Sequence, residues 1–149
     1  MERVEEHIGV DQEVASFVLP VGATINMDGT SLYQGVAAVF ISQALGFDLT
    51  FGNQLTIVLT ALLASIGSAA VPGAGMVMLV IVLESIGFPP DKLAIGLALI
   101  FAVDRPLDMC RTVVNVTGDA TVSMVVAKSV DKLGDPHVEE WDDNYDEVK

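Results

Sequence analysis

The sequence predicts an all-α membrane protein built from broken helices, and three observations support this prediction. Of the 149 residues 52% are apolar and the mean hydropathy is +0.56, yet the net charge is −13. The charges gather at the two ends, because residues 1–20 and 129–149 together supply −10 of that charge. In the long apolar middle, no run reaches the ~18 uninterrupted residues of a simple membrane-spanning helix. Paired, interrupted apolar segments of this kind are typical of the core of a membrane transporter.

The composition also excludes several classes of protein. The acidic balance makes nucleic acid an unexpected partner. The single cysteine, Cys110, lies in an apolar stretch, so neither a disulfide framework nor a cysteine metal site is expected. We expect no signal peptide, because the N-terminus is acidic and lacks an apolar core segment. The length fits one domain and leaves open whether that domain is complete.

The first expected element is a broken helix at 13–46, preceded by a solvated, partly helical lead-in at 1–12. Pro20 and Gly22 are expected to interrupt the regular backbone of this helix. Gly46 is expected to end it, because glycine suits the position that follows a helix.

A further break is expected at Asn26-Met27-Asp28-Gly29. Asn26 and Asp28 are two positions apart, so a regular helix would aim their side chains at nearly opposite faces. An unwound segment lets both side chains point inward, and Gly29 permits the turn.

Residues 54–86 are expected to form a re-entrant hairpin that enters and leaves the membrane on the same side. Its two apolar segments, 55–66 and 76–86, would each reach only about 18 Å as helices, short of a ~30 Å hydrocarbon core. The tip between them is rich in small residues, and backbone at that depth is stable only where it lines a cavity. Asn53 is the expected N-cap of the first segment.

The last expected element is one long helix at 91–130, with a kink at Pro106. The broken helix, the hairpin and the long helix together make a partial transport domain at 13–132. Lysines at its end favour a cytoplasmic C-terminus. The acidic residues 133–149 are expected to form a disordered tail.

One face of the long helix carries the polar residues of the apolar middle. At about 100° per residue, these side chains fall within an arc of roughly 80°, with Thr112 at its edge; they are Asp104, Asp108, Arg111, Asn115 and Asp119. The flanking segments are too apolar for a surface helix, so this face must meet something other than bulk water. Ionisable groups at membrane depth each cost about 2.5–3.5 kcal/mol, so such a cluster predicts a functional site.

Three motifs, in the same order along the chain, resemble the dicarboxylate/amino acid:cation symporters, the family of glutamate and aspartate transporters. They are Asn26-Met27-Asp28-Gly29-Thr30, the tip Ser65-Ile66-Gly67-Ser68 through Pro72 to Gly75, and Asp108-Met109-Cys110-Arg111-Thr112 continuing through Asn115 to Asp119. The resemblance covers residues 9–132. It implies the C-terminal third of such a transporter, with its seventh helix, second re-entrant hairpin and eighth helix.

The resemblance also implies partners and a location. The chain would be a non-enzymatic, multi-pass part of the cell (inner) membrane, surrounded by lipid bilayer and by the remainder of the transporter chain. The full-length protein would be a homotrimer. It would need no cofactor other than sodium as the coupling ion.

The substrate site is likewise implied by the resemblance. Arg111 would pair with the side-chain carboxylate of an acidic amino acid, Asp108 would hold its α-amino group, and Asp104 would brace Arg111. The other residues expected to surround the substrate are Thr112, Asn115, Thr30, Met27, Val71, Ala74 and Gly75. A fixed guanidinium suits a carboxylate, in agreement with this assignment.

The implied sodium sites draw on oxygen ligands, which hard cations prefer. One group comprises Asp119, Asn115, Asn26 and the carbonyl of Gly22, and a second joins Asp28 with Asn26. A third uses backbone oxygens at Thr24, Ser65, Ile66 and Ser68. The chain departs from the family at Ser68 and Ala70, where Thr and Gly are common, and at Cys110, where Gly is common.

Three alternatives stay open at the level of sequence. An intramembrane aspartyl protease also needs two carboxylates, but it needs them to share a proton without an arginine beside them. A non-transporting fragment is the second alternative. The third is a C4-dicarboxylate or proton-coupled symporter of the same family. Asp108 argues against a dicarboxylate, which has no amino group to balance that charge.

Overall fold

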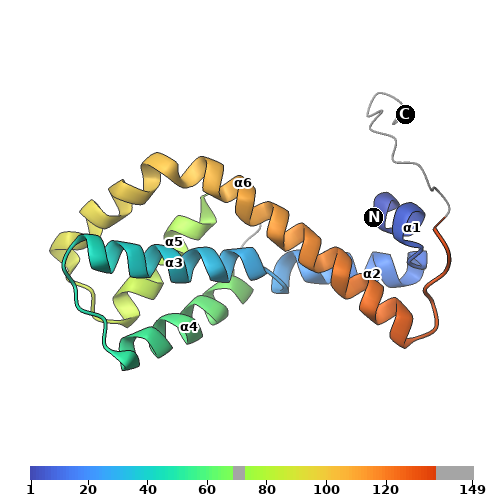
Figure 1. The fold of residues 1–149 in the computed structure, drawn as a ribbon, viewed down its shortest axis with the longest axis horizontal. Coiled ribbons are helices and arrows are strands. Elements are labelled where there is room, and N and C mark those ends of the chain that lie inside the picture. The colour runs from blue at the N-terminus through green and yellow to red at the C-terminus, as the bar shows by residue number, and fades with distance from the viewer. Residues whose placement is uncertain (69–72, 137–149) are drawn as a thin grey trace. The chain divides into compact units, whose positions relative to one another are not determined.

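The computed structural model describes residues 1–68 and 73–136, and in this part the secondary structure is helical, without a strand. The helices are α1 (Glu2–Ile8), α2 (Gln12–Ile25), α3 (Asp28–Ala44), α4 (Phe51–Ile66), α5 (Ala74–Ser85) and α6 (Pro90–Ser129), as Figure 1 shows. The predicted all-α class is therefore confirmed. Most of the expected acidic tail, at 137–149, lies outside the described residues.

The chain divides into two compact units. Unit 1 comprises residues 1–20 and 120–149, and unit 2 comprises residues 21–119. Helices α2 and α6 each begin in one unit and end in the other. The expected transport domain at 13–132 therefore draws on both units.

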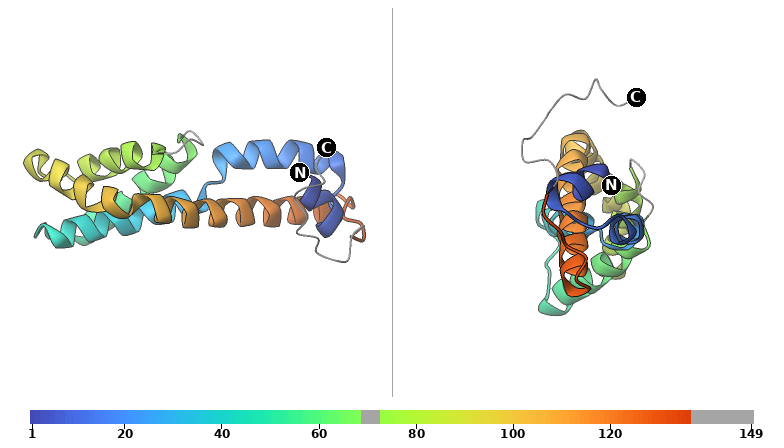
Figure 2. Two further views of the ribbon diagram at one scale, coloured as in Figure 1. Left: turned by 90° about the horizontal axis from the view of Figure 1, so that it is seen from above. Right: turned by 90° about the vertical axis from the view of Figure 1, so that its right-hand side faces the viewer.

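Unit 2 is built around three helices, α3, α4 and α5, which pack against one another (Figures 1 and 2). Their apolar side chains recur every three or four residues, so each helix presents one face to the other two; the buried members include Ala37, Ala38, Ile41, Ile57, Ala61, Leu79, Val82 and Leu83. The alanines let the helices approach closely. Gln34 is fully buried in α3, and neither polar atom of its amide has a partner among the described residues.

Of the two breaks predicted in the first part of the chain, one is absent and one is present. Helix α2 runs through Pro20 and Gly22, so the expected interruption there was wrong. Proline holds φ near its helical value, so the helix can continue, although the residue removes one backbone hydrogen bond and crowds the carbonyl four residues earlier. The second expected break is confirmed: the helix is interrupted at Asn26 and Met27, and Met27 has the non-helical angles φ −102° and ψ 64°. Asp28 already belongs to α3.

The hairpin begins earlier than predicted. Thr50 is the N-cap of α4, and its side-chain oxygen accepts a hydrogen bond of 3.2 Å from the backbone N–H of Asn53. The expected cap at Asn53 was therefore wrong, because the threonine hydroxyl satisfies one of the free N–H groups of the first turn. Helix α6, which follows the hairpin, is one continuous helix of 40 residues, and Pro106 lies inside it.

Among the described residues, none of the helices combines the length and the apolar character of a single membrane span.

In unit 1, the segment just before α2 pairs with the segment just after α6. Val10 and Leu133 form an antiparallel bridge, with hydrogen bonds from Asp11 N–H to the Lys132 carbonyl (3.1 Å) and from Gly134 N–H to the Gly9 carbonyl (2.8 Å). Val10 is 2% exposed in a small apolar core, so the expectation that the lead-in at 1–12 is solvated was wrong at this end.

Lys132 supports the same contact electrostatically. It donates a hydrogen bond to Glu13 and lies 3.9 Å from the Asp11 carboxylate. The hydrogen bond to Glu13 raises the pKa of Lys132. Asp11 and Glu13 lie near the start of α2, so Lys132 joins the segment after α6 to the start of α2 by electrostatic contacts.

We expect Gly9→Ala to destabilise unit 1 more than a comparable change elsewhere. Gly9 has φ +79°, and a methyl group there would lie 2.9 Å from the carbonyl carbon of Gly134. Gly46→Ala is the matched control, because Gly46 also has a positive φ (+67°) but its Cβ would meet open space. The left-handed strain should cost each variant about 1 kcal/mol, and the backbone clash should cost Gly9→Ala about 2 kcal/mol more. Denaturant unfolding followed by circular dichroism measures both, and equal losses would contradict the close contact.

Candidate functional site

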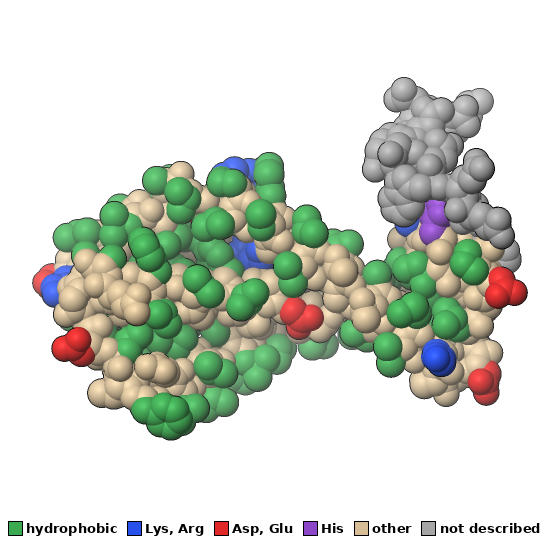
Figure 3. Space-filling view, in the orientation of Figure 1, with side chains coloured by type: hydrophobic (Ala, Val, Ile, Leu, Met, Phe, Trp, Pro, Cys, Tyr) green, Lys and Arg blue, Asp and Glu red, His purple; other side chains and the backbone are tan. Residues whose placement is uncertain are grey.

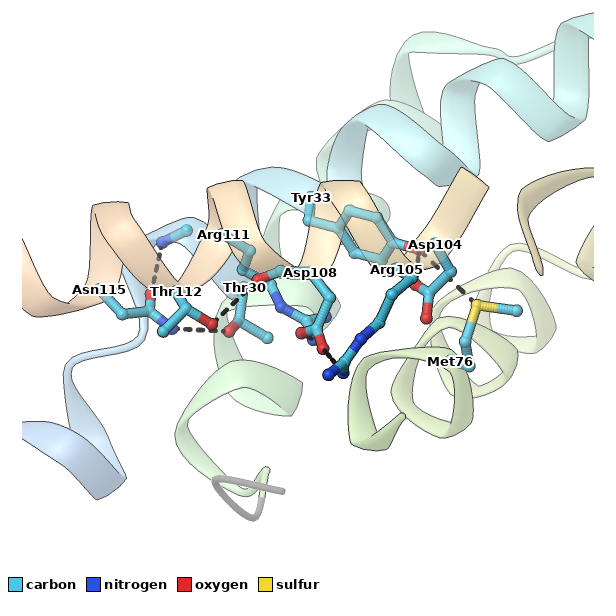
Figure 4. A network of polar contacts seen from close by, with 10 residues as sticks. Thr30, Tyr33, Met76, Asp104, Arg105, Asp108, Arg111, Thr112 and Asn115 are labelled. Atoms are coloured by element: carbon cyan, nitrogen blue, oxygen red, sulfur yellow. Dashed lines mark hydrogen bonds and ion pairs between the residues drawn. The ribbon is translucent and has the colours of Figure 1, made fainter. Parts of the chain in front are cut away.

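Arg111 is the centre of the polar face of α6. Its side chain is 7% exposed, and its Nη2 forms an ion pair with Asp108 Oδ1 one turn earlier. The guanidinium carbon lies 5.0 Å from the centroid of the Tyr33 ring, a cation–π distance. The other terminal nitrogen, Nη1, is buried and has no hydrogen-bond partner among the described residues. Arg111 is therefore a buried cation that is only partly satisfied (Figure 4).

Tyr33 connects Arg111 to Asp104. The hydroxyl of Tyr33 donates a hydrogen bond of 2.6 Å to Asp104 Oδ1 and lies 3.6 Å from the sulfur of Met76. The sequence suggested that Asp104 braces Arg111; in the structure Asp104 holds the ring on which the guanidinium stacks. Sequence reasoning missed Tyr33, although its place one helical turn after Thr30 puts the two side chains on one face.

Two glycines allow the backbone to approach Arg111. A methyl group at Gly75, in the first turn of α5, would overlap the guanidinium, since it would lie 2.9 Å from Cζ and closer still to Nη1. A methyl group at Gly29 would overlap the backbone carbonyl of Arg111 and lie 3.0 Å from Val114 Cβ. The first turn of α5, which contains Ala74 and Gly75, therefore lies against the guanidinium of Arg111.

Asn115 joins α6 to the break between α2 and α3. Its Oδ1 accepts a hydrogen bond of 2.8 Å from Gly29 N–H, and its Nδ2 donates one of 3.2 Å to the Thr30 hydroxyl. Thr30 and Met27 are both buried beside this contact, at 3% and 6% exposure. Thr112 donates to the Asp108 carbonyl at 2.9 Å and is exposed.

A second cluster, rich in oxygen, lies where α2 ends. Asn26 Nδ2 donates a hydrogen bond of 3.1 Å to Asp119 Oδ1, and Asp119 is only 8% exposed. A methyl group at Gly22 would lie 2.9 Å from the carboxylate carbon of Asp119, and one at Gly118 would lie 2.9 Å from Asp28 Oδ2. The structure therefore brings together the carboxylates and amide expected to bind sodium, and the donor chemistry suits a hard cation.

The remaining predicted residues lie at the ends of other helices. Ser65 and Ile66 end α4, Ser68 follows them with a 3.3 Å bond from its N–H to the Ser65 carbonyl, and Thr24 is in the last turn of α2. The predicted substrate contact Val71, like Ala70, lies outside the described residues.

Arg105 is a site residue that sequence reasoning did not consider. Its Nη1 lies 3.6 Å from Asp108 Oδ2, and its side chain is 69% exposed. Asp108 itself is 14% exposed, so this carboxylate has one buried and one solvated arginine beside it. The i,i+3 spacing of Arg105 and Asp108 is the signal that was available in the sequence.

The helical fold thus places two polar clusters, one around Arg111 and one around Asp119, close to the break between α2 and α3. Residues 1–129 match the family model of the sodium:dicarboxylate symporter family. The chain belongs to this family, and so to a class of transporters and not of enzymes.

Several curated relatives agree with this assignment. The chain is 54% identical to an excitatory amino acid transporter of Onchocerca volvulus and to excitatory amino acid transporter 1 of Rattus norvegicus, in each case over 83% of this chain. It is 52% identical to excitatory amino acid transporter 5 of Homo sapiens over 82% of this chain. These alignments cover 24%, 22% and 21% of the relatives, so the chain spans less than a quarter of their length.

Proposed function

We propose that this chain is the substrate- and cation-binding C-terminal portion of a symporter that carries an acidic amino acid, glutamate or aspartate, together with sodium. The helices would be the seventh helix (α2 and α3), the second re-entrant hairpin (α4 and α5) and the eighth helix (α6) of that transporter. The relatives described above are excitatory amino acid transporters, and this supports the substrate class.

The observation that carries the proposal concerns Nη1 of Arg111, which is buried and has no hydrogen-bond partner among residues 1–68 and 73–136. A buried guanidinium donor without a partner costs free energy, and a carboxylate is the group that satisfies it best. The positive end of the α5 dipole lies at the same place. Asp108, directly beside the guanidinium, provides the negative charge that an α-amino group needs.

Sodium would bind at the cluster of Asn26, Asp28 and Asp119. Carboxylate and amide oxygens are the ligands that a hard cation prefers. Asn115 would link the two sites physically, because it holds Gly29 and Thr30 at the helix break between them. A ligand at one site would thus favour the arrangement that the other ligand needs.

Exposed apolar side chains support a membrane environment for unit 2. Hydrophobic side chains are spread over its visible face in Figure 3, and acidic or basic ones are few there. Leu32, Leu63 and Phe101 are 63%, 69% and 74% exposed. A surface of this kind suits lipid and the other helices of a transporter, and we propose a multi-pass membrane protein that assembles as a trimer.

The test is transport by the full-length protein that contains this chain, reconstituted in liposomes. Uptake of labelled aspartate and glutamate is expected only with sodium outside, and collapse of the sodium gradient should stop it. Vesicles with N-methylglucamine in place of sodium are the control. Equal uptake in both conditions would contradict sodium symport.

Asp119→Asn is expected to weaken sodium binding and make substrate affinity less dependent on sodium. The change keeps the shape of the side chain but removes a full charge from the oxygen cluster. If sodium raises the affinity for substrate, substrate must raise the affinity for sodium by the same factor, so a variant that loses one effect must also lose the other. Substrate affinity measured across a sodium titration reports them, and an unchanged sodium slope would mean that Asp119 has only a structural role.

A further inference from the structure

The side chain of Met76 lies where α3, α5 and α6 meet. Its sulfur is 3.6 Å from the hydroxyl of Tyr33 in α3, and that hydroxyl donates a hydrogen bond of 2.6 Å to Asp104 Oδ1 in α6. Figure 4 shows the sulfur on the side of the Tyr33 hydroxyl. Met76 belongs to the first turn of α5, next to Gly75, which lies against the guanidinium of Arg111. The position of this turn at the candidate site therefore depends in part on how Met76 packs on Tyr33.

The hydroxyl of Tyr33 has one proton and two acceptors near it. A tyrosine hydroxyl donates one hydrogen bond. Asp104 holds this proton, because a carboxylate accepts a shorter and stronger hydrogen bond than a thioether sulfur does. The sulfur of Met76 is polarizable and only weakly polar, so it packs against the hydroxyl without needing the proton. An oxygen atom attached to this sulfur would compete with Asp104 for a proton that is already taken.

Met76 is open to a small oxidant by the route that the substrate takes. This step rests on the function proposed above, since a site that admits aspartate must open to water and hydrogen peroxide is smaller than aspartate. Met76 is half-buried, whereas Met27, the other methionine beside the candidate site, is 6% exposed. Met76 is therefore the methionine of this site that a peroxide reaches first.

We propose that Met76 is a modification site at which a peroxide reversibly weakens substrate binding. The thioether sulfur attacks one oxygen of hydrogen peroxide, so the O–O bond breaks and an S–O bond forms. The departing hydroxide takes the proton of the new S–OH group and leaves as water. The sulfur is oxidised by two electrons to the sulfoxide, and the peroxide is reduced to water. Methionine sulfoxide reductases reverse this change.

Oxidation replaces a weakly polar contact by a strongly polar one that lacks a donor. The sulfoxide oxygen of Met76 meets the lone pairs of the Tyr33 hydroxyl and the negative charge of Asp104, and a polar group buried without a hydrogen bond costs free energy. This cost disappears when the first turn of α5 moves away from Tyr33. The positive end of the α5 dipole then leaves the guanidinium of Arg111, so a substrate carboxylate binds more weakly there.

The test measures sodium-dependent binding of labelled aspartate to the full-length protein before and after treatment with hydrogen peroxide. Peptide mass spectrometry gives the fraction of Met76 that carries one added oxygen atom. The oxidised fraction should bind aspartate about tenfold more weakly than the untreated protein. Methionine sulfoxide reductases A and B, added together, should restore the affinity, because each enzyme reduces one of the two sulfoxide epimers.

Two variants assign the effect to one sulfur atom. Met76→Leu keeps an apolar side chain of similar volume without a sulfur, so its aspartate affinities before and after peroxide should be equal, whatever the starting value. This variant still contains the exposed thiol of Cys110, so it also separates methionine oxidation from thiol oxidation. Met78→Leu is the matched control, because Met78 is also half-buried in α5. It should respond to peroxide as the unmodified protein does.

The outcomes separate this inference from the proposed function. Loss of aspartate affinity that persists in Met76→Leu would overturn the inference, and so would complete oxidation of Met76 with unchanged affinity. Failure of peroxide to oxidise Met76 while Met78 is oxidised would overturn it as well. None of these results affects the proposed function, which depends on sodium-dependent aspartate binding in the untreated protein. Absence of that binding would overturn both.

Discussion

Replacing Arg111 by cysteine is expected to abolish the binding of acidic substrates and to leave the binding of small neutral amino acids possible. The buried guanidinium is the donor available for a substrate side-chain carboxylate, and Asp108 remains to hold an α-amino group. Removing one partner of a buried, hydrogen-bonded charge pair costs about 2–5 kcal/mol, so aspartate affinity should fall by about 30-fold to several thousandfold, which removes binding at ordinary substrate concentrations. Competition by aspartate, glutamate, alanine and serine in the full-length protein measures this change.

Lys128→Cys is the control for this variant. It introduces the same thiol and removes the same charge from the same helix, but its side chain is exposed. Its substrate profile should match that of the unmodified protein. Undiminished affinity for aspartate and glutamate in Arg111→Cys would mean that the guanidinium does not bind substrate.

Gly29→Ala is expected to have the largest effect on the stability of unit 2. A methyl group there would overlap the backbone carbonyl of Arg111, and a backbone atom of a long helix cannot rotate away as a side-chain tip can. Such overpacking costs about 3 kcal/mol. It would also push apart the helices that Asn115 joins, so both substrate and sodium affinity should fall. Denaturant unfolding of the chain in detergent, followed by circular dichroism, gives the change in free energy.

Gly35→Ala is the matched variant, because Gly35 lies in the same helix and its added methyl group would meet nothing within 4 Å. Alanine is the better helix former, so this variant should be up to about 1 kcal/mol more stable than the unmodified chain. Similar destabilisation of the two variants would show that α3 and α6 do not approach closely at Gly29.

Helix content and the polar face of α6 were open to prediction because they depend on local sequence. A polar residue at every third or fourth position of an apolar segment marks one face of a helix wherever that helix is placed. Asp108, Arg111 and Asn115 were identified in this way, and their roles came from the resemblance of three motifs. The break at Asn26 was predictable for a similar reason, since two inward polar groups two positions apart do not suit a regular helix.

Helix boundaries depended on smaller differences in free energy. Pro20 was expected to interrupt α2, but the helix continues through it, although proline removes one hydrogen bond and crowds the carbonyl four residues earlier. The choice of Thr50 over Asn53 as the N-cap of α4 was equally local, because both side chains suit the position.

The sequence by itself determined the helical class, the broken segments and the set of polar residues that make the candidate site. Only the tertiary structure decided how α3, α5 and α6 meet, and therefore that Tyr33 lies under Arg111 and that Gly75 leaves room for the guanidinium. It also decided that Asp108 has a second arginine at Oδ2. These contacts depend on which helix faces pack together. The spacing of polar residues along α6 identifies one face of that helix, but it does not indicate which residues of α3 or α5 lie opposite.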